Sequence, residues 1–148
     1  MAATYSAVDL NTKARHMGGY GNAVIHYGSV TPTTGAIGDV YRPVRIPAGT
    51  VLTDLSFVTG DLDTGTGTIS AKVGYAPVDT VAGPTADDAY FAATATTLLA
   101  AAGRKEMSFQ PIKFEKDVYI TVTLTIAANA FAAVAVTAIA KGIGEGIK

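Results

Sequence analysis

The chain has 148 residues, enough for one domain with its own core, and it contains no cysteine. A disulfide framework, a thiolate nucleophile and a zinc site built on cysteine are therefore excluded. Its 11 basic and 12 acidic residues nearly cancel and form no basic stripe, so we expect no nucleic-acid partner.

Charged residues make up 16% of the chain, against about 25% in an ordinary soluble domain, and the mean hydropathy is positive. Two interpretations stay open: a partner covers part of the surface, or the many small alanines raise the hydropathy without forming an apolar patch. Residues 1–22 hold no apolar run of the signal-peptide kind, and the apolar window at 127–140 is too short and too rich in alanine to span a bilayer. We expect no membrane partner and a protein made in the cytoplasm.

The first 22 residues are small, polar and punctuated by glycine, and they fit neither a helical nor a strand period. They predict an N-terminal arm that is frayed when the protein is alone or ordered when it lies across a neighbour. Residues 23–30 then alternate as a strand. Val24, His26 and Gly28 share one face of it, and Ile25 and Tyr27 share the other.

The next two predicted strands, 38–46 and 51–59, are joined by a tight turn. Pro43 removes one ladder hydrogen bond, which predicts an edge position or a bulge in the first strand. Arg42 and Arg45 flank this proline, where they either protect the edge from unwanted pairing or bind carboxylates of a partner. The second strand is predicted to carry Val51, Leu55 and Phe57 on one face, with Asp54 and Ser56 on the other.

A hairpin is predicted from residues 51–59 and 68–76, with a glycine-rich loop between them. Residues 86–93 are compatible with one helical turn that places Asp87 and Asp88 near its positive N-terminal end. Three further segments follow in order: an ambiguous stretch at 94–102, a charged turn at 103–106 and an apolar segment at 107–114.

The clearest strand signal runs from Asp117 to Ile126. Its aliphatic residues alternate with Tyr119 and three threonines, which predicts a half-buried antiparallel strand with partners on both edges. The aliphatic set is Val118, Ile120, Val122, Leu124 and Ile126. A final strand is predicted at 132–140, with a helix as the alternative because alanine favours helices.

Seven or eight strands separated by turn signals, with little helix, are typical of a two-sheet sandwich. The predicted fold class is all-β: an antiparallel β-sandwich of the jelly-roll or Greek-key type with an extended N-terminal arm. An immunoglobulin-like sandwich is disfavoured because the inter-sheet cysteine pair and core tryptophan are lacking. The predicted organisation is an arm at 1–22, a single domain at 23–141 and a flexible C-terminal tail at 142–148.

One stretch has some likeness to a metal site. Asp61, Asp63 and Gly65 resemble the start of a calcium loop, but the later glycine and glutamate positions of such a loop hold Thr66 and Lys72. A solvated hairpin tip is therefore the favoured interpretation, and we expect no metal and no cofactor.

No pattern points to catalysis. His16 and His26 lack the spacing of a metal site, and Asp87-Asp88 has no histidine or further acid close by in the sequence. The repeated glycines at 142–146 are not followed by a helix, so a flexible terminus is favoured over a phosphate loop. We expect no catalytic residue and no enzymatic activity.

Two short segments carry a family resemblance. The run from Gly38 to Leu52, with its Gly-Asp-Val and Ile-Pro-Ala-Gly-Thr-Val-Leu motifs, and the later Val73-Gly74-Tyr75 resemble small structural proteins of tailed bacteriophages, of the capsid decoration or cement type. Asp87-Asp88-Ala89-Tyr90-Phe91 and a threonine-rich closing strand pair occur in similar order, and the resemblance covers about residues 36–140. It implies a sandwich on the outside of an icosahedral shell that fastens neighbouring major capsid subunits, without catalytic residues.

We therefore expect a virion protein that is made in the host cytoplasm and cements the capsid exterior. Its expected partners are the major capsid protein and further copies of itself, as a dimer or trimer. The alternative is a carbohydrate-binding or other receptor-binding module of a phage fibre or tail, which predicts an exposed aromatic cluster of Tyr20, Tyr27 and Tyr41. The candidate interface residues are Tyr20, His26, Tyr41, Arg42 and Arg45.

Overall fold

The computed structural model describes residues 2–13 and 22–147, and within these ranges the chain forms β-strands and no helix. The strands are β1 (Thr4–Ser6), β2 (Asn22–Val30), β3 (Val40–Arg42), β4 (Arg45–Ile46), β5 (Thr50–Thr59), β6 (Ser70–Pro77), β7 (Asp87–Thr96), β8 (Gly103–Glu106), β9 (Ile112–Phe114), β10 (Val118–Ile126) and β11 (Val136–Gly144).

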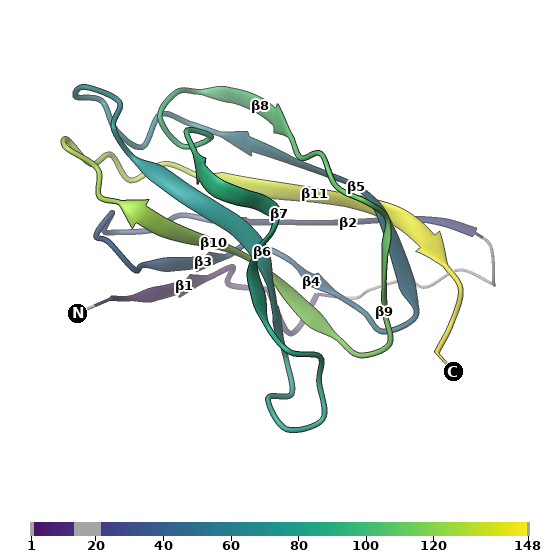
Figure 1. The fold of residues 1–148 in the computed structure, drawn as a ribbon. Coiled ribbons are helices and arrows are strands. Elements are labelled where there is room, and N and C mark those ends of the chain that lie inside the picture. The colour runs from purple at the N-terminus through teal and green to yellow at the C-terminus, as the bar shows by residue number, and fades with distance from the viewer. Residues whose placement is uncertain (1, 14–21, 148) are drawn as a thin grey trace.

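The strands form two sheets that pack face to face (Figure 1). In the β11 sheet the order is β2–β11–β5–β8, and β9 also pairs with β5. In the β10 sheet the order is β1–β3–β10–β6–β7, and β4 also pairs with β10. With β3 and β4 taken as one interrupted strand, and β8 and β9 as another, each sheet has the strand order of a jelly roll, to which β1 is an addition. The predicted all-β sandwich is confirmed.

β10 lies inside its sheet, antiparallel to β6 on one side and to β3 and β4 on the other. The predicted inward set is confirmed from Val118 to Leu124, whose aliphatic members are at most 2% exposed. Ile126 is the exception, because a bulge between Leu124 and Ile126 shifts the register and leaves Ile126 46% exposed.

The core lies between the two sheets and joins residues that are distant in the sequence. Each large aliphatic or aromatic side chain removed from water there contributes about 1.5–3 kcal/mol. The largest completely buried side chains include Tyr41, Phe57, Ile46, Leu52, Leu55, Leu62, Ile69, Leu98, Leu99 and Ile120.

Residues 86–93 do not form the helical turn that the paired aspartates suggested. Residues 87–96 form β7, which pairs with β6 and places Phe91, only 3% exposed, in the core. Asp88 therefore has no helix terminus to stabilise, and its carboxylate instead lies 3.4 Å from Lys72 Nζ on the neighbouring strand. Burial of an aromatic side chain outweighs the weak local preference for a helical turn.

Other sequence predictions are wrong as well. Residues 51–59 and 68–76 do not form the predicted hairpin, because β5 and β6 lie in different sheets. Residues 103–106 are strand β8 on the edge of the β11 sheet, not a turn. In β5, Leu52 rather than Val51 is buried beside Leu55 and Phe57, since a bulge at Thr53 of β5, opposite Lys141 and Gly142 of β11, shifts the pairing by one residue. A shift of one residue reverses which face of the sheet a side chain occupies.

Both ends of the described chain add strand structure outside the predicted domain bounds of 23–141. Near the start, β1 pairs in parallel with β3, with Tyr5 opposite Tyr41. Near the end, β11 continues through Gly144, three residues beyond the predicted start of the tail. Both segments therefore belong to the sheets of this chain.

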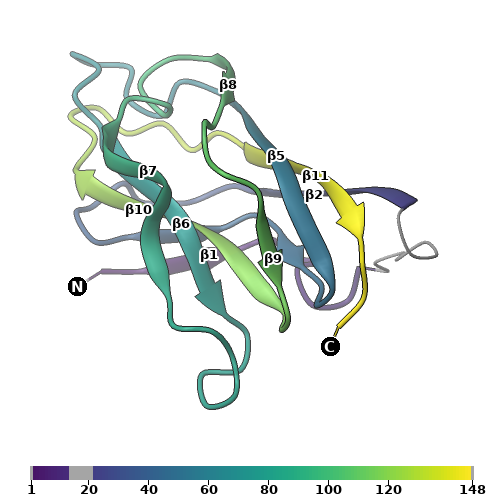
Figure 2. The same ribbon diagram turned by 45° about the vertical axis from the view of Figure 1, so that its right-hand side comes forward.

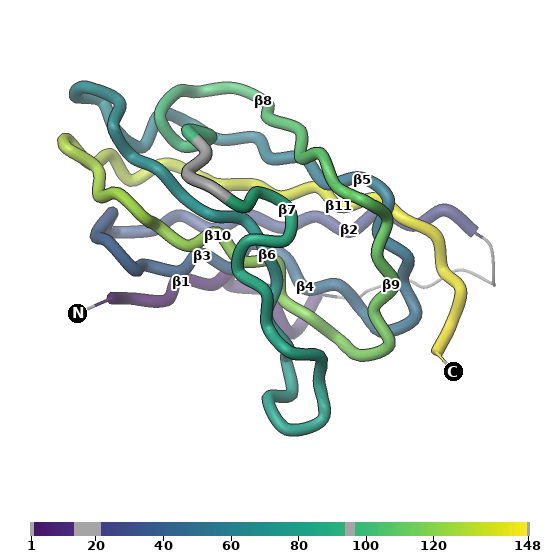
Figure 3. Tube along the Cα trace, viewed as in Figure 1, coloured from purple at the N-terminus to yellow at the C-terminus, as the bar shows by residue number. Residues whose placement is uncertain are grey.

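The connection between β6 and β7 projects from the sandwich in both views (Figures 2 and 3). Its tip is organised by the carboxylate of Asp79, which accepts hydrogen bonds from the amides of Val81 and Ala82. Val81 is 94% exposed at this tip.

Candidate interaction surface

The outer face of the β11 sheet carries an exposed apolar cluster from three neighbouring strands. The register places Ile139 of β11 beside Tyr27 of β2, and Ile143 of β11 between Ala23 and Val51. Ile25 and Tyr27 are 64% and 57% exposed, and Val58 and Ile143 are about 40% exposed. We call this cluster, made of Ile25, Tyr27, Val58, Ile139 and Ile143, the apolar face.

The apolar face exists because β11 has an unusual alternation. Its inward positions hold small residues, Ala138 and Ala140, and its outward positions hold the larger Ile139 and Ile143. The sequence predicted a strand here, and nothing was inferred from its outward residues. The signal was present in the sequence, since isoleucines on a solvent face are costly unless a partner covers them.

One ion pair interrupts the apolar face. Lys141 Nζ lies 2.9 Å from a carboxylate oxygen of Asp54 on the neighbouring strand, and both side chains are partly exposed. Such a pair contributes at most about 1 kcal/mol to stability. It does give a partner surface a donor and an acceptor within an otherwise apolar region.

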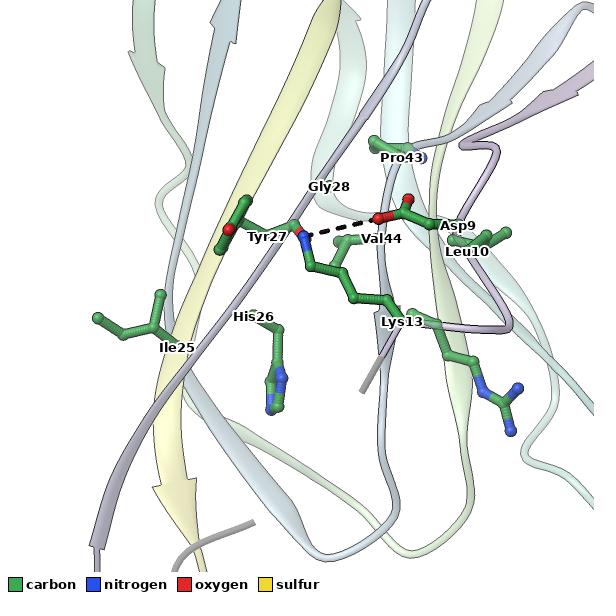
Figure 4. A pocket seen from close by; sticks show the side chains of 10 residues that line it. Asp9, Leu10, Lys13, Ile25, His26, Tyr27, Gly28, Pro43 and Val44 are labelled. Carbon is green, nitrogen blue, oxygen red and sulfur yellow. Dashed lines mark hydrogen bonds and ion pairs between the residues drawn. The ribbon is translucent and has the colours of Figure 1, made fainter. Parts of the chain in front are cut away.

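The N-terminal segment closes one side of this region. Ala7 and Leu10 are buried against the sandwich, and Lys13 lies with its ammonium 3.4 Å from the ring centroid of Tyr27. Lys13 Nζ also donates a hydrogen bond of 2.9 Å to the backbone oxygen of Tyr27 and lies 3.8 Å from Asp9. Figure 4 shows Lys13 extending between these two residues.

Beneath Lys13 there is a cavity of about 160 Å³ between the N-terminal segment, β2 and β4. Its lining includes the apolar residues Leu10, Ile25 and Val44, and also Arg45. His26, one of the expected interface residues, also lines this cavity and is only 6% exposed. Its side chain points into the sandwich, on the opposite side of β2 from Ile25 and Tyr27.

Tyr41 is a core residue. Its side chain is completely buried, its hydroxyl donates a hydrogen bond of 2.9 Å to the backbone oxygen of Thr34, and its ring meets Tyr5 edge to face. Burial also raises the pKa of Tyr41 above the ordinary value of a phenol. Tyr41 was expected at an interface, but in this fold its buried side chain cannot contact a partner.

Arg42 and Arg45 are half-buried on the outer side of β3 and β4. The guanidinium of Arg42 lies 5.1 Å from the ring centroid of Tyr119. Arg45 donates two hydrogen bonds, of 2.8 and 2.6 Å, to one carboxylate oxygen of Asp117 and a third to Asn11. Much of the hydrogen-bonding capacity of the Arg45 guanidinium is thus already used by contacts within the chain.

Tyr20, the remaining candidate, lies outside the described residues. Of the predicted aromatic cluster, Tyr27 alone is an exposed member among the residues that the structure describes. Because Tyr41 is buried, the exposed cluster of all three tyrosines that the carbohydrate-binding alternative predicts does not form.

Asp39 ties the N-terminal strand to the sandwich. Its completely buried carboxylate accepts hydrogen bonds from the amides of Ala3 and Ala36, at 2.7 and 3.0 Å, and from the hydroxyl of Thr34. Burial alone would raise the pKa of Asp39, but these hydrogen bonds outweigh burial and hold the pKa below its ordinary value. The Gly-Asp-Val motif is therefore a structural anchor for β1.

Asp63 has a similar role in the connection between β5 and β6. Its carboxylate accepts hydrogen bonds from the backbone amides of Thr68, Ile69, Asn129 and Ala130. The sequence resembled a calcium loop here, but backbone donors occupy the oxygens that would face a cation. These bonds, that of Ala130 foremost, lower the pKa of Asp63 to about 2.

This geometry predicts a pH dependence of stability. The pKa of Asp63 is about 2 in the folded protein and 3.8 as a free side chain, so its stabilising effect is complete above about pH 4 and is lost as the pH falls towards 2. Thermal denaturation between pH 5 and about 2 should therefore show a smaller acid-induced fall in Tm for Asp63→Asn than for the parent chain. The matched control is Asp61→Asn, which changes a carboxylate two residues away. Its Tm should fall with pH as steeply as that of the parent chain. Equal slopes for all three proteins would contradict the assignment.

The described residues contain no group of three or more His, Cys, Asp or Glu side chains placed to hold a metal ion. Within the same ranges no helix is long and apolar enough to cross a membrane.

No protein-family model and no curated protein match the sequence. Among solved structures, the chain is similar to a chain of the capsid of Ralstonia phage GP4, with a TM-score of 0.78, 16% identity, and coverage of 99% of this chain and 100% of that one. It is also similar to a chain of the cyanophage Pam1 capsid asymmetric unit, with a TM-score of 0.65, 17% identity, and coverage of 90% and 92%. A chain of the acid-stable capsid of Helicobacter pylori bacteriophage KHP30 matches with a TM-score of 0.56, 14% identity, and coverage of 88% and 90%. At these identities the likeness establishes a shared fold.

Proposed function

We propose that the chain is a bacteriophage virion protein that decorates the exterior of an icosahedral capsid and cements it by bridging major capsid subunits. The observation that carries this proposal is the full-length likeness to a chain of the Ralstonia phage GP4 capsid. A likeness over the whole of both chains supports a similar use of the entire sandwich, not of a shared subdomain. The proposed role is structural, with no catalytic step.

The apolar face is the surface proposed to meet the shell. A 16% charged fraction leaves few groups to hold water at the surface, and Ile25, Tyr27 and Ile143 are exposed together on one side of the molecule. The Lys141–Asp54 pair lies among them and offers a donor and an acceptor to the same partner. Because a shell repeats its subunits, modest affinity at each copy adds to strong overall attachment.

The proposal predicts which substitutions weaken attachment. Replacing Val58 and Ile143 together with aspartate should lower the affinity for capsids that lack the protein by about 100-fold, because two carboxylates would be buried against an apolar partner. The measurement is co-sedimentation of the purified chain with such capsids over a range of concentrations.

The matched control replaces Val8 and Val81 with aspartate. Both valines are more than 90% exposed and lie outside the apolar face, so this variant should bind like the parent chain. Loss of binding in both double variants to the same extent would show that the apolar face is not the attachment surface. Absence of the protein from purified particles of its phage would remove the capsid role itself.

A further inference from the structure

We propose that the edge of β2 that has no neighbouring strand among the described residues, called the free edge below, pairs with β2 of a second copy of this chain. The two strands would run antiparallel about a two-fold axis, so that two β11 sheets join into one. The inference concerns contact between copies and goes beyond the attachment to a capsid. It does not depend on that attachment, and its test uses the purified protein alone.

The other sheet edges of the described chain are protected against pairing. In the described chain, β1 and β7 are the outer strands of the β10 sheet, and β2 lies opposite β8 and β9 in the β11 sheet. β1 has three residues, β7 begins with Asp87-Asp88, β8 reads Gly-Arg-Lys-Glu, and β9 carries Lys113. Short length and charged side chains are the usual means by which proteins keep sheet edges from pairing.

Within its own sequence, β2 lacks these protections. It is nine residues long and contains no Lys, Arg, Asp, Glu or Pro. Its outward side chains include the exposed Ile25 and Tyr27. Two copies of such a strand can lie antiparallel without bringing like charges together, which is what an interface between identical subunits requires.

The backbone groups available for this pairing can be assigned. The backbone oxygen of Tyr27 accepts the hydrogen bond from Lys13, so it points away from β11. Lys141 lies opposite Ile25, and its own backbone oxygen accepts a hydrogen bond from Thr53 on the β5 side, so Ile25 is not hydrogen-bonded to Lys141. Since backbone direction alternates along a strand, Ala23, Ile25, Tyr27 and Ser29 present their amide and carbonyl groups to the free edge.

The register follows from full overlap of the two strands. When all nine residues of β2 pair, Ile25 lies opposite Tyr27 of the second copy, and the reverse contact forms across the axis. Aromatic residues paired with β-branched ones are favourable cross-strand neighbours. In this arrangement the hydrogen bond from Lys13 to the backbone oxygen of Tyr27 must break. In the single copy, Lys13 therefore partly protects the edge from pairing.

The first test is the molar mass in solution. Sedimentation equilibrium of the full chain, from micromolar to millimolar concentration, should show a mass that rises from 15.1 kDa towards twice that value. Ile25→Lys should stay at 15.1 kDa, because a lysine on the edge opposes pairing while an exposed position tolerates it. The control Ile143→Lys changes the same face away from the edge and should associate like the parent chain.

The second test reads the edge directly by amide hydrogen exchange. Raising the protein concentration should slow exchange at the amides of Ile25, Tyr27 and Ser29 and leave Val24 and His26, which pair with β11, unchanged. A mass of 15.1 kDa throughout would overturn the proposal. A second result would also overturn it: Ile143→Lys abolishes association as fully as Ile25→Lys does, and hydrogen exchange along the edge of β2 does not change with concentration. The contact between copies would then be the apolar face.

Discussion

Replacing Tyr41 with alanine is expected to lower the free energy of unfolding by about 3–5 kcal/mol. The side chain has no exposed surface, so alanine would leave a cavity the size of an aromatic ring between the sheets. The substitution also removes the edge-to-face contact with Tyr5 and leaves the backbone oxygen of Thr34 without its donor. Chemical denaturation followed by circular dichroism measures the loss.

Tyr41→Phe is the matched control for this prediction. It keeps the ring and removes only the hydroxyl, so the expected loss is about 1 kcal/mol. Capsid attachment by Tyr41→Phe should equal that of the parent chain, because a completely buried ring offers a partner no contact. If Tyr41→Phe lost much of its capsid attachment while its stability stayed unchanged, Tyr41 would have to contact the partner after all.

Replacing Gly28 with valine is expected to cost at least about 3 kcal/mol, enough to leave little folded protein at ordinary temperature. A Cβ atom at this position would lie 2.1 Å from the backbone oxygen of Pro43, where real Cβ contacts are essentially never under 3.0 Å. The clash is with backbone, so no side-chain rotation relieves it. Soluble yield and thermal denaturation provide the measurement.

The control is valine at the next position. Ser29 is exposed on the opposite side of β2, and valine suits a strand, so Ser29→Val should leave Tm within a few degrees of the parent. If Gly28→Val folded as well as Ser29→Val, β2 would not approach Pro43 as closely as the structure has it. That approach also forms one wall of the cavity beside Lys13.

The sequence predicted best those elements whose pattern is local and long. The alternation from Val118 to Leu124 identified β10 and its buried face. The alternation from Val24 to Gly28 identified β2 and the residues that share a face, but not which face is buried. An alternation with a period of two residues shows directly which side chains share a face, whichever strands pair with it. The two-sheet sandwich was predicted from the strand count, and the jelly-roll type from the mixture of long and short connections and the missing immunoglobulin features.

The candidate site was harder to predict, because exposure depends on which strands cover a face. Arg42 and Tyr41 are neighbours in the sequence, yet one is half-buried near Tyr119 and the other is in the core. The outward isoleucines of β11 looked like ordinary strand residues until the register placed them beside Tyr27. The anchoring roles of Asp39 and Asp63 could not be predicted from the sequence, because some of their hydrogen-bond donors are backbone amides from distant segments.

The sequence by itself determined the fold class, the central strand and the absence of any cysteine chemistry, since composition and strand alternation are properties of the chain before it folds. Only the tertiary structure decided that residues 87–96 are a strand, that Leu52 and not Val51 is buried, and that one sheet edge lacks charge. Bulges shift the register by one residue, and edges are defined by which strands lack a neighbour. Both depend on contacts between segments far apart in the chain, which no local pattern records.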